Sequence, residues 1–242
     1  MAVTELWLAR HGESIGNVAA SRAEAEGLDV IPLDVRDADV PLSSTGREQA
    51  LALGEWLTAH RGGLDAYWVS PYARARETLD IALGAEGPGT AAVVVDERIR
   101  DRELGVLDLL TRHGVERRHP DEMARRRHLG KFYHRPPGGE SWADVALRLR
   151  SFLRDALDGP EERALLVAHD AVVMLVLYVL LPMGETELLD FATDHTVLNA
   201  SVTHLTRAED GWKLATFSDV AHLRREGADV TAHPGSPDVE PR

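Results

Sequence analysis

Short apolar runs typical of β-strands alternate with amphipathic helical patterns along most of this chain. Strands are expected over Glu5–Ala9, Ala66–Ser70, Ala91–Val95 and Ala164–Ala168, and helices over Thr45–His60, after Pro71 and from Ser141. Two further strands are expected at Val197–Leu205 and Trp212–Phe217. Strands separated by helices are typical of sheets whose faces are both covered by helices. The alternation therefore predicts an α/β fold.

The length of 242 residues allows one domain or two. We expect a single domain over residues 1–225. Within it, residues 98–135 are polar, rich in arginine and histidine and weakly periodic, which favours a lid-like insertion. Residues 226–242 are rich in Gly, Pro and Asp, so a mobile tail is expected there.

Composition excludes several classes of function. A net charge of −13 disfavours general binding to nucleic acid or to an anionic membrane. The absence of cysteine removes disulfides, thiolate catalysis and cysteine-bound zinc. The apolar run Ala171–Pro182 is too short to cross a bilayer and is expected to be a buried helix. With no signal-like segment at the start, we expect a cytoplasmic protein. The run Arg125–Arg127 is expected to be a solvated helix face.

The first expected strand leads directly into Arg10-His11-Gly12-Glu13-Ser14, with Asn17 three residues further on. In open α/β sheets, ligands bind where strands end at their carboxyl side. A neutral imidazole can attack phosphorus and later release the phosphoryl group to water. An adjacent guanidinium can neutralise phosphate oxygens with its planar array of donors. The string therefore predicts phosphoryl transfer, with His11 as the nucleophile.

Five ordered motifs between residues 5 and about 205 resemble the histidine phosphatase superfamily, in its phosphoglycerate mutase-like branch. They are Arg10-His11-Gly12-Glu13 with Asn17, Leu42-Ser43 to Gly46 with Gln49-Ala50, Ser70-Pro71-Tyr72-Ala73-Arg74-Ala75-Arg76-Glu77-Thr78, Gly139-Glu140-Ser141, and Val167-Ala168-His169. The resemblance implies that Arg74 binds phosphate and that His169 is the second histidine of the phosphate pocket. Arg10, Asn17 and Ser14 are the further phosphate-binding candidates. Together with the alternation it predicts a three-layer sandwich with a mixed, mainly parallel sheet flanked by helices.

The proton donor to the leaving oxygen has three candidates. In the family that this chain resembles, the proton donor is a glutamate within a short sequence pattern. The matching stretch here is Ile99-Arg100-Asp101-Arg102-Glu103-Leu104-Gly105, which places Asp101 at the position of that glutamate. Asp170 is the second candidate, because a His-Asp pair resembles the acid phosphatase and phytase branch. Glu103 is the third. Asp101 is preferred, although it is one methylene shorter than the family's residue.

The predicted function is hydrolysis of a small phosphorylated metabolite through a phosphohistidine, without metal or cofactor. Lys131 and Tyr133, in Gly130-Lys131-Phe132-Tyr133, are expected to cap the pocket and contact the part of the substrate that does not react. No nucleic-acid or membrane partner is expected, and a homo-oligomer is possible. A phosphoglycerate mutase is the closest alternative, disfavoured because no segment resembles the mutase insertion. A non-catalytic protein that binds a phosphorylated ligand is the other.

Overall fold

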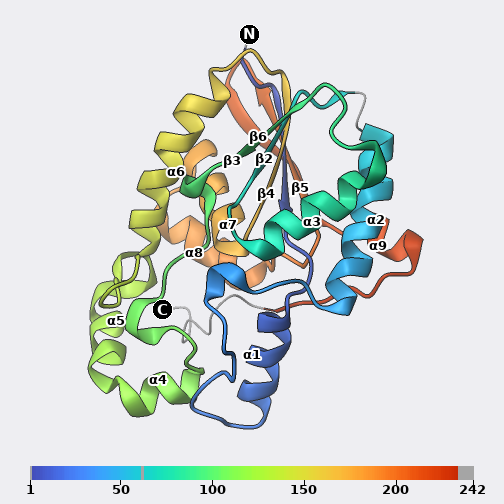
Figure 1. The fold of residues 1–242 in the computed structure, drawn as a ribbon. Helices are drawn as coiled ribbons and strands as arrows, with labels where there is room; N and C mark the ends of the chain where they lie inside the picture. The colour runs from blue at the N-terminus through green and yellow to red at the C-terminus, as the bar shows by residue number, and fades with distance from the viewer. Residues whose placement is uncertain (1, 61–62, 234–242) are drawn as a thin grey trace.

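The computed structural model describes residues 2–60 and 63–233, and it shows a sheet held between helices (Figure 1). The six strands of the sheet are β1 (Glu5–Arg10), β2 (Ala66–Val69), β3 (Ala92–Val95), β4 (Arg163–Ala168), β5 (Val202–Ala208) and β6 (Gly211–Asp219). Their order is β3-β2-β4-β1-β5-β6. The first four strands in that order are parallel, and β5 and β6 run antiparallel to their neighbours. The predicted mixed, mainly parallel sheet is confirmed.

The helices follow most of the expected pattern. They are α1 (Ile15–Ala25), α2 (Ser44–His60), α3 (Ala73–Leu83), α4 (Arg112–Arg118), α5 (Pro120–Tyr133), α6 (Trp142–Leu157), α7 (Asp170–Leu180), α8 (Glu185–Asp194) and α9 (Ala221–Glu226). Ser141 caps α6, and its hydroxyl accepts a hydrogen bond from the Asp144 amide. Helices α1, α4, α8 and α9 were not predicted as helices, and α5 was anticipated only at Arg125–Arg127.

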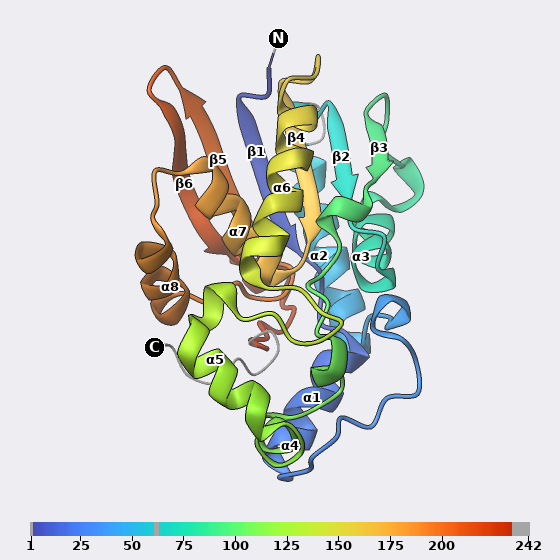
Figure 2. The ribbon, with the colours of Figure 1, turned by 90° about the vertical axis from the view of Figure 1, so that its left-hand side faces the viewer.

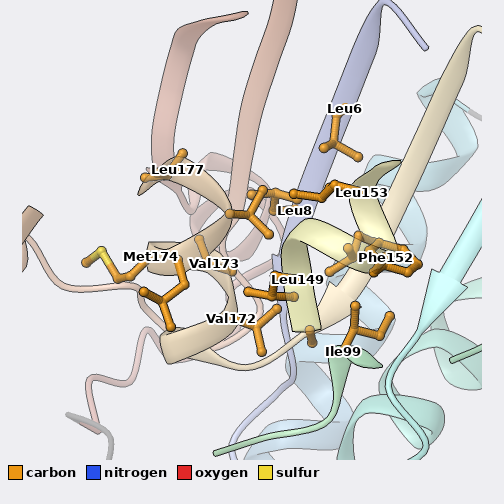
Figure 3. Close-up of a cluster of buried hydrophobic side chains, with 14 of the residues drawn as sticks. Leu6, Leu8, Ile99, Leu149, Phe152, Leu153, Val172, Val173, Met174 and Leu177 are labelled. Carbon is orange, nitrogen blue, oxygen red and sulfur yellow. The ribbon is translucent and has the colours of Figure 1, made fainter. Parts of the chain in front are cut away.

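Alternate residues of the central strands face two separate apolar cores. Leu6 and Leu8 of β1 pack with α6 and α7, in the cluster drawn in Figure 3. Trp7 and Ala9 lie in the other core, with residues of α2 and α3. This division follows from the two-residue period of a strand, which sends successive side chains to opposite faces. The result is a three-layer sandwich, with α6 and α7 on one face and α2 and α3 on the other (Figure 2).

Strand pairing brings the two expected phosphate-site histidines together. β1 and β4 are parallel neighbours, and Arg10 is paired with Ala168 in their register. His11 and His169 each follow the last residue of their strand, so both leave the carboxyl edge of the sheet at the same level. Their ring centroids are 5.2 Å apart. The edge at which open α/β sheets bind ligands is therefore where this chain places its imidazoles.

A close contact between two glycines fixes the turn that follows β1. A Cβ on Gly12 would lie 2.5 Å from the carbonyl oxygen of Gly46, and a Cβ on Gly46 would lie 1.9 Å from the carbonyl oxygen of Glu13. Neither position has room for a side chain. The Ser43 hydroxyl also donates to the Glu13 carboxylate and accepts from the Gly46 amide. Ser43 and Gly46 of the second motif, at the start of α2, therefore hold Gly12 and Glu13 of the first motif in place.

The expected strand at Val197–Leu205 begins later than predicted, at Val202. The preceding residues form a loop against the first motif instead. The Ala200 amide donates to the His11 carbonyl, and Ala200 adopts a φ of 52°. The Asn199 side-chain amide also donates to the His11 carbonyl. The Ala200 amide therefore serves the turn after β1, and the Asn199 amide donates to the Thr231 carbonyl, so neither pairs with β6.

Most of the segment 98–135 lies beyond the carboxyl edge of the sheet, where α4 approaches α1 and α5 lies on the far side of α4 from α1 (Figure 1). It is pinned to the loop after α1, because the Ile31 amide donates to the Leu109 carbonyl and the Thr111 amide to the Asp29 carbonyl. Within the described part of the expected tail, His233 forms hydrogen bonds with Arg10 and Glu13 of the first motif, and Asp229 and Thr231 accept from Gln49 of the second. The rest of that tail, 234–242, lies outside the described residues. None of the helices formed by the described residues has the length and apolar character needed to span a membrane.

Candidate active site

A cavity of about 440 Å³ opens at the carboxyl edge of the sheet. Most of the site residues predicted from the sequence line it, namely Arg10, His11, Ser14, Asn17, Arg74, Asp101, Glu103, Lys131 and Asp170. His169 is fully buried beside the cavity and contacts its lining through Asp101. Tyr133 is absent from the lining. It is more than half exposed, and its hydroxyl interacts with Glu185.

His11 is held in the neutral form with one defined tautomer. Its Nδ1 lies 2.7 Å from the carbonyl oxygen of its neighbour Gly12, an acceptor, so Nδ1 carries the proton and Nε2 carries the lone pair. Burial, together with Arg74, His169 and Arg10, holds the pKa of His11 well below its ordinary value. The imidazole is therefore unprotonated at neutral pH and able to act as a nucleophile through Nε2.

Arg10 is buried beside His11 with one donor left unsatisfied. Its Nη1 donates to the Val197 carbonyl over 2.6 Å, and its Nη2 to the His233 carbonyl over 2.7 Å. Its Nε finds no acceptor among the residues that the structure describes. A buried donor of this kind is costly unless a ligand supplies the acceptor. An anion bound next to His11 would supply it.

Arg74, in the first turn of α3, is held by two carboxylates. Its Nη1 and Nη2 lie 3.0 and 3.1 Å from the two carboxylate oxygens of Asp37. Nη2 also donates to Asp101 over 2.8 Å. Burial alone would lower the pKa of Arg74, but Asp37 and Asp101 more than offset that effect and raise it. The guanidinium is therefore permanently charged, and its two Nη groups are placed to bind the oxygens of an anion.

Asp101 lies between the expected phosphate ligands. Its Oδ2 is 2.8 Å from Arg74 Nη2 and 3.2 Å from His169 Nδ1. On the other side of the ring, His169 Nε2 is 2.8 Å from the Ser70 hydroxyl. Burial would raise the pKa of Asp101, but His169 and Arg74 instead hold it well below its usual range. A carboxylate oxygen thus occupies the position that suits a phosphate oxygen.

The other two acid candidates lie differently. Asp170 is the first residue of α7, and its Oδ1 accepts from the Ala171 amide over 2.8 Å. Glu103 accepts from the Tyr72 hydroxyl over 2.8 Å, and its side chain is 49% exposed. Both line the cavity, and Asp101 is the candidate whose carboxylate lies against Arg74 and His169.

Ser14 and Asn17 form the capping box at the start of α1. The Ser14 hydroxyl accepts from the Asn17 amide, and the Asn17 side-chain oxygen accepts from the Ser14 amide. Both residues also line the cavity. Their structural role as turn and cap residues is visible, and their phosphate-binding role stays a prediction.

The remaining sequence predictions are met in part. Lys131 lines the cavity, with its ammonium 4.5 Å from the centre of the Trp142 ring. Tyr133, predicted beside it as a cap, interacts with Glu185 instead, because α5 turns it outward into solvent. The run Arg125–Arg127 was expected to be a solvated face, and its outer two residues are exposed. Arg126 is buried, so that prediction is wrong for the middle residue.

Several site residues were not predicted from the sequence as site residues. Thr78 and Ser70 lie within the third motif, where the Thr78 hydroxyl accepts from the Gly12 amide and Ser70 contacts His169. Asp37, Asn199 and His233 lie far along the chain from the residues that they contact. His233 reaches Glu13 with Nε2 over 2.8 Å. Only the motif context of Thr78 and Ser70 was a signal for finding them.

The part of the chain that the structure describes holds no group of three His, Asp or Glu side chains suited to a metal ion. The cluster consists instead of one neutral imidazole, two guanidiniums, a second histidine and a carboxylate around one cavity. Such an arrangement can neutralise a tetrahedral anion, present a nitrogen nucleophile and move a proton.

Comparison with known proteins agrees with this chemistry. A family model described as the histidine phosphatase superfamily, branch 1, matches residues 6–220. A protein described as "Probable phosphoglycerate mutase GpmB", from Erwinia tasmaniensis, is 29% identical over 235 residues, which cover 93% of this chain and 97% of that protein.

Two solved structures show the same fold. The alpha-ribazole phosphatase from Shigella flexneri superposes with a TM-score of 0.72 at 19% identity, over 89% of this chain and 96% of that one. The mycobacterial glucosyl-3-phosphoglycerate phosphatase gives a TM-score of 0.66 at 27% identity, over 90% of this chain and 100% of that one.

Proposed function

Because the chain belongs to branch 1 of the histidine phosphatase superfamily, we propose that it hydrolyses a small phosphomonoester through a phosphohistidine at His11. The observation that carries the proposal is the convergence of His11, Arg10 and Arg74 on one cavity. The neutral His11 ring and the unsatisfied Arg10 Nε suit a nucleophile and an anion ligand. A cavity of about 440 Å³ also holds more than a phosphate, and so has room for a leaving group.

The reaction has two displacements. His11 Nε2 attacks phosphorus, the N–P bond forms, and the P–O bond to the leaving alkoxide breaks while Asp101 gives that oxygen a proton. Arg10, Arg74 and His169 neutralise the negative charge on the phosphoryl oxygens during the transfer. Water then attacks phosphorus, Asp101 takes the proton from that water, and the N–P bond breaks to regenerate the neutral imidazole.

The position of Asp101 supports its role as the acid. In the free protein its pKa is held low, chiefly by His169 and Arg74 acting against burial. A bound phosphate would take over the contacts of these two residues and add negative charge beside the carboxyl. Both changes raise the pKa of Asp101, so that it takes up a proton as substrate binds. Asp170 acts instead on Arg10, whose pKa its charge raises against the effect of burial, and Glu103 accepts a hydrogen bond from the Tyr72 hydroxyl.

The proposed hydrolysis is tested by following released phosphate and isomerised phosphoglycerate in parallel. The panel holds simple alkyl and aryl phosphates, sugar phosphates, nucleotides and 3-phosphoglycerate. We expect phosphate release from one or more members, with little isomerisation. Isomerisation that exceeds phosphate release would support a mutase. Inertness toward the whole panel, with binding of vanadate retained, would support a non-catalytic protein that binds phosphorylated ligands.

Asp101→Asn is expected to slow phosphorylation of the protein by an alkyl phosphate by about 10²–10⁴-fold. The loss should be far smaller with 4-nitrophenyl phosphate, because 4-nitrophenolate leaves without a proton. Single-turnover measurements of phosphoenzyme formation check this expectation. Asp170→Asn and Glu103→Gln are the matched controls, expected to slow both substrates alike. If the dependence on the leaving group appears in the Asp170 variant and not in the Asp101 variant, the acid is Asp170.

A further inference from the structure

Beside the phosphate cluster, the cavity has a largely apolar wall. Its residues come from the loop after α1, the segment around η5 (Gly105–Leu107) and the starts of α6 and α7; they are Ile31, Leu33, Leu104, Leu109, Leu110, Trp142 and Met174. The first two segments are joined by the hydrogen bond from the Ile31 amide to the Leu109 carbonyl and by the isolated bridge between Val30 and Leu110. A wall tied together in this way is a preformed surface for an apolar group.

Leu109 is held in the left-handed region, with a φ of 55°. A branched, bulky residue at this φ costs about 1–3 kcal/mol and persists only where its surroundings fix it. The Leu109 carbonyl is one of the groups that join the two loops. The strain therefore falls on a residue that lines the substrate cavity, where such strain is commonly functional.

Positive charge in the lining is already engaged by protein groups. Arg10 and Arg74 make the contacts described above, Arg102 donates to the Glu140 carbonyl, and Lys131 lies over the Trp142 ring. Against these four cations the lining of the free protein carries five carboxylates, those of Asp37, Asp101, Glu103, Asp108 and Asp170. The four other than Asp101 keep their negative charge when Asp101 takes up its proton. A phosphate dianion would add further negative charge. A second acidic group on the substrate would meet repulsion there.

Asp108 is the carboxylate that adjoins the apolar wall. It precedes Leu109, and its Oδ1 accepts from the Leu109 amide over 3.0 Å. Burial raises the pKa of Asp108, and the charges of Asp37 and Glu103 raise it further. The carboxylates of Asp37, Glu103 and Asp108 therefore place their negative charges in the same part of the cavity. Among the described residues, the Asp108 side chain forms no hydrogen bond with Arg10, His11, Arg74 or His169, and Arg74 acts on it through charge alone. Its substitution therefore removes a charge from the cavity lining without removing a hydrogen bond of the proposed catalytic groups.

We propose that the substrate is a phosphomonoester whose leaving group has an apolar body and carries no second acidic group, being neutral or cationic, with Asp108 as a residue that rejects anionic leaving groups. This inference rests on the proposed phosphatase activity. It distinguishes the expected substrate from a phosphoglycerate, which carries a carboxylate beside its phosphate. The apolar wall binds the body of the leaving group, and the carboxylates repel a second anion.

The test compares 4-methylphenyl, 4-carboxyphenyl and 4-(aminomethyl)phenyl phosphate, which differ in charge at one remote position and little in the acidity of the leaving phenol. For the unaltered protein, kcat/KM for the carboxylated compound should be at least about tenfold below that for the methyl compound. The aminomethyl compound should match or exceed the methyl compound. Equal kcat/KM for all three, or a preference for the carboxylated one, would overturn the inference.

The Asp108 variants test the residue itself. Asp108→Asn should reduce the discrimination against the carboxylated compound several-fold, and Asp108→Lys should abolish it. Asp80→Asn, an exposed carboxylate on α3 away from the cavity lining, removes the same charge and should leave the discrimination unchanged. Thermal unfolding checks that each variant is folded, and Asp108→Asn serves alone if the lysine variant is not. Discrimination that is unchanged in the Asp108 variants would overturn the role of Asp108.

Failure of the inference and failure of the proposed function give different results. Hydrolysis of all three compounds at similar rates leaves the phosphatase activity in place and removes the substrate class. Hydrolysis of none of them, by folded protein that does hydrolyse other members of the panel, removes the substrate class and leaves the phosphatase activity in place. Inertness toward these three compounds and the whole panel overturns the proposed function and the inference together.

Discussion

His11→Ala is expected to lower kcat by at least about 10⁴-fold and to abolish the acid-labile phosphoenzyme. The physical reason is that the variant removes the atom to which phosphorus transfers, while Arg10 and Arg74 remain to bind the anion. Binding of vanadate or phosphate should therefore persist, with a change much smaller than the loss of turnover. Released phosphate, phosphoenzyme and ligand binding are measured on the same preparation.

The matched control for this variant is His195→Ala. His195 lines the same cavity, but its ring stacks on Phe191, 4.1 Å away, and its Nδ1 lies 3.1 Å from the Phe191 carbonyl oxygen. It should keep turnover within a few-fold of the unaltered protein. A His11→Ala variant that still turns over at a comparable rate would show that another group accepts the phosphoryl group.

Arg74→Ala is expected to lower kcat/KM by about 10³–10⁵-fold, the range found when an arginine that stabilises a phosphoryl transition state is lost. Arg74 is 5% exposed and provides two Nη groups, a geometry that suits two phosphate oxygens. Arg74→Lys keeps the charge but loses that planar fork, so a smaller but still large loss is expected. Steady-state kinetics on both variants measure the difference.

Removing Arg74 also takes away the guanidinium that the carboxylates of Asp37 and Asp101 share. We expect a lower unfolding midpoint, because partly buried carboxylates then lack a partner. Arg76→Ala, on an exposed site of the same helix, is the control and should change neither activity nor stability appreciably. If the loss of activity in Arg74→Ala were no larger than in Arg76→Ala, Arg74 would not be a phosphate ligand.

The layered fold was predictable because its signals are local. Leu6 and Leu8 against Trp7 and Ala9 show the two-residue period that sends side chains to two cores, and the strand at 164–168 shows a continuous apolar run. The juxtaposition of His11 and His169 also followed, since both leave strand ends at one edge of the sheet. By contrast, α8 was missed, and the polar segment 98–135 gave little periodicity although it forms α4 and α5.

The contacts that complete the site were not predictable, because they join residues far apart in sequence. Asp37 lies in a short 3₁₀ turn, η1 (Asp37–Asp39), and reaches Arg74 only once α3 is packed on the sheet. His233, more than 200 positions from its partners, contacts Glu13, and its carbonyl accepts a hydrogen bond from Arg10. Nothing in the local pattern of the tail, which is rich in glycine and aspartate, distinguishes such a residue from a solvated one.

The orientation of the His11 ring also could not be predicted from the sequence. The motif identifies an imidazole at the end of a strand, but the Gly12 carbonyl decides which nitrogen carries the proton. Burial and neighbouring cations, which keep the ring neutral, depend on the packing of three separate segments. The nucleophilic nitrogen, Nε2, is therefore a result of the tertiary structure.

The most direct measurement is to identify the residue that carries phosphate during turnover. The protein is mixed with a phosphomonoester that it hydrolyses, and the reaction is quenched in base within one turnover. The protein is then digested, and the modified peptide is sequenced by mass spectrometry. The phosphoryl group should be found on His11, be stable in base and labile in acid, and disappear at the rate of phosphate release. Turnover with no phosphate on His11, or with the group on another residue, would contradict the central proposal.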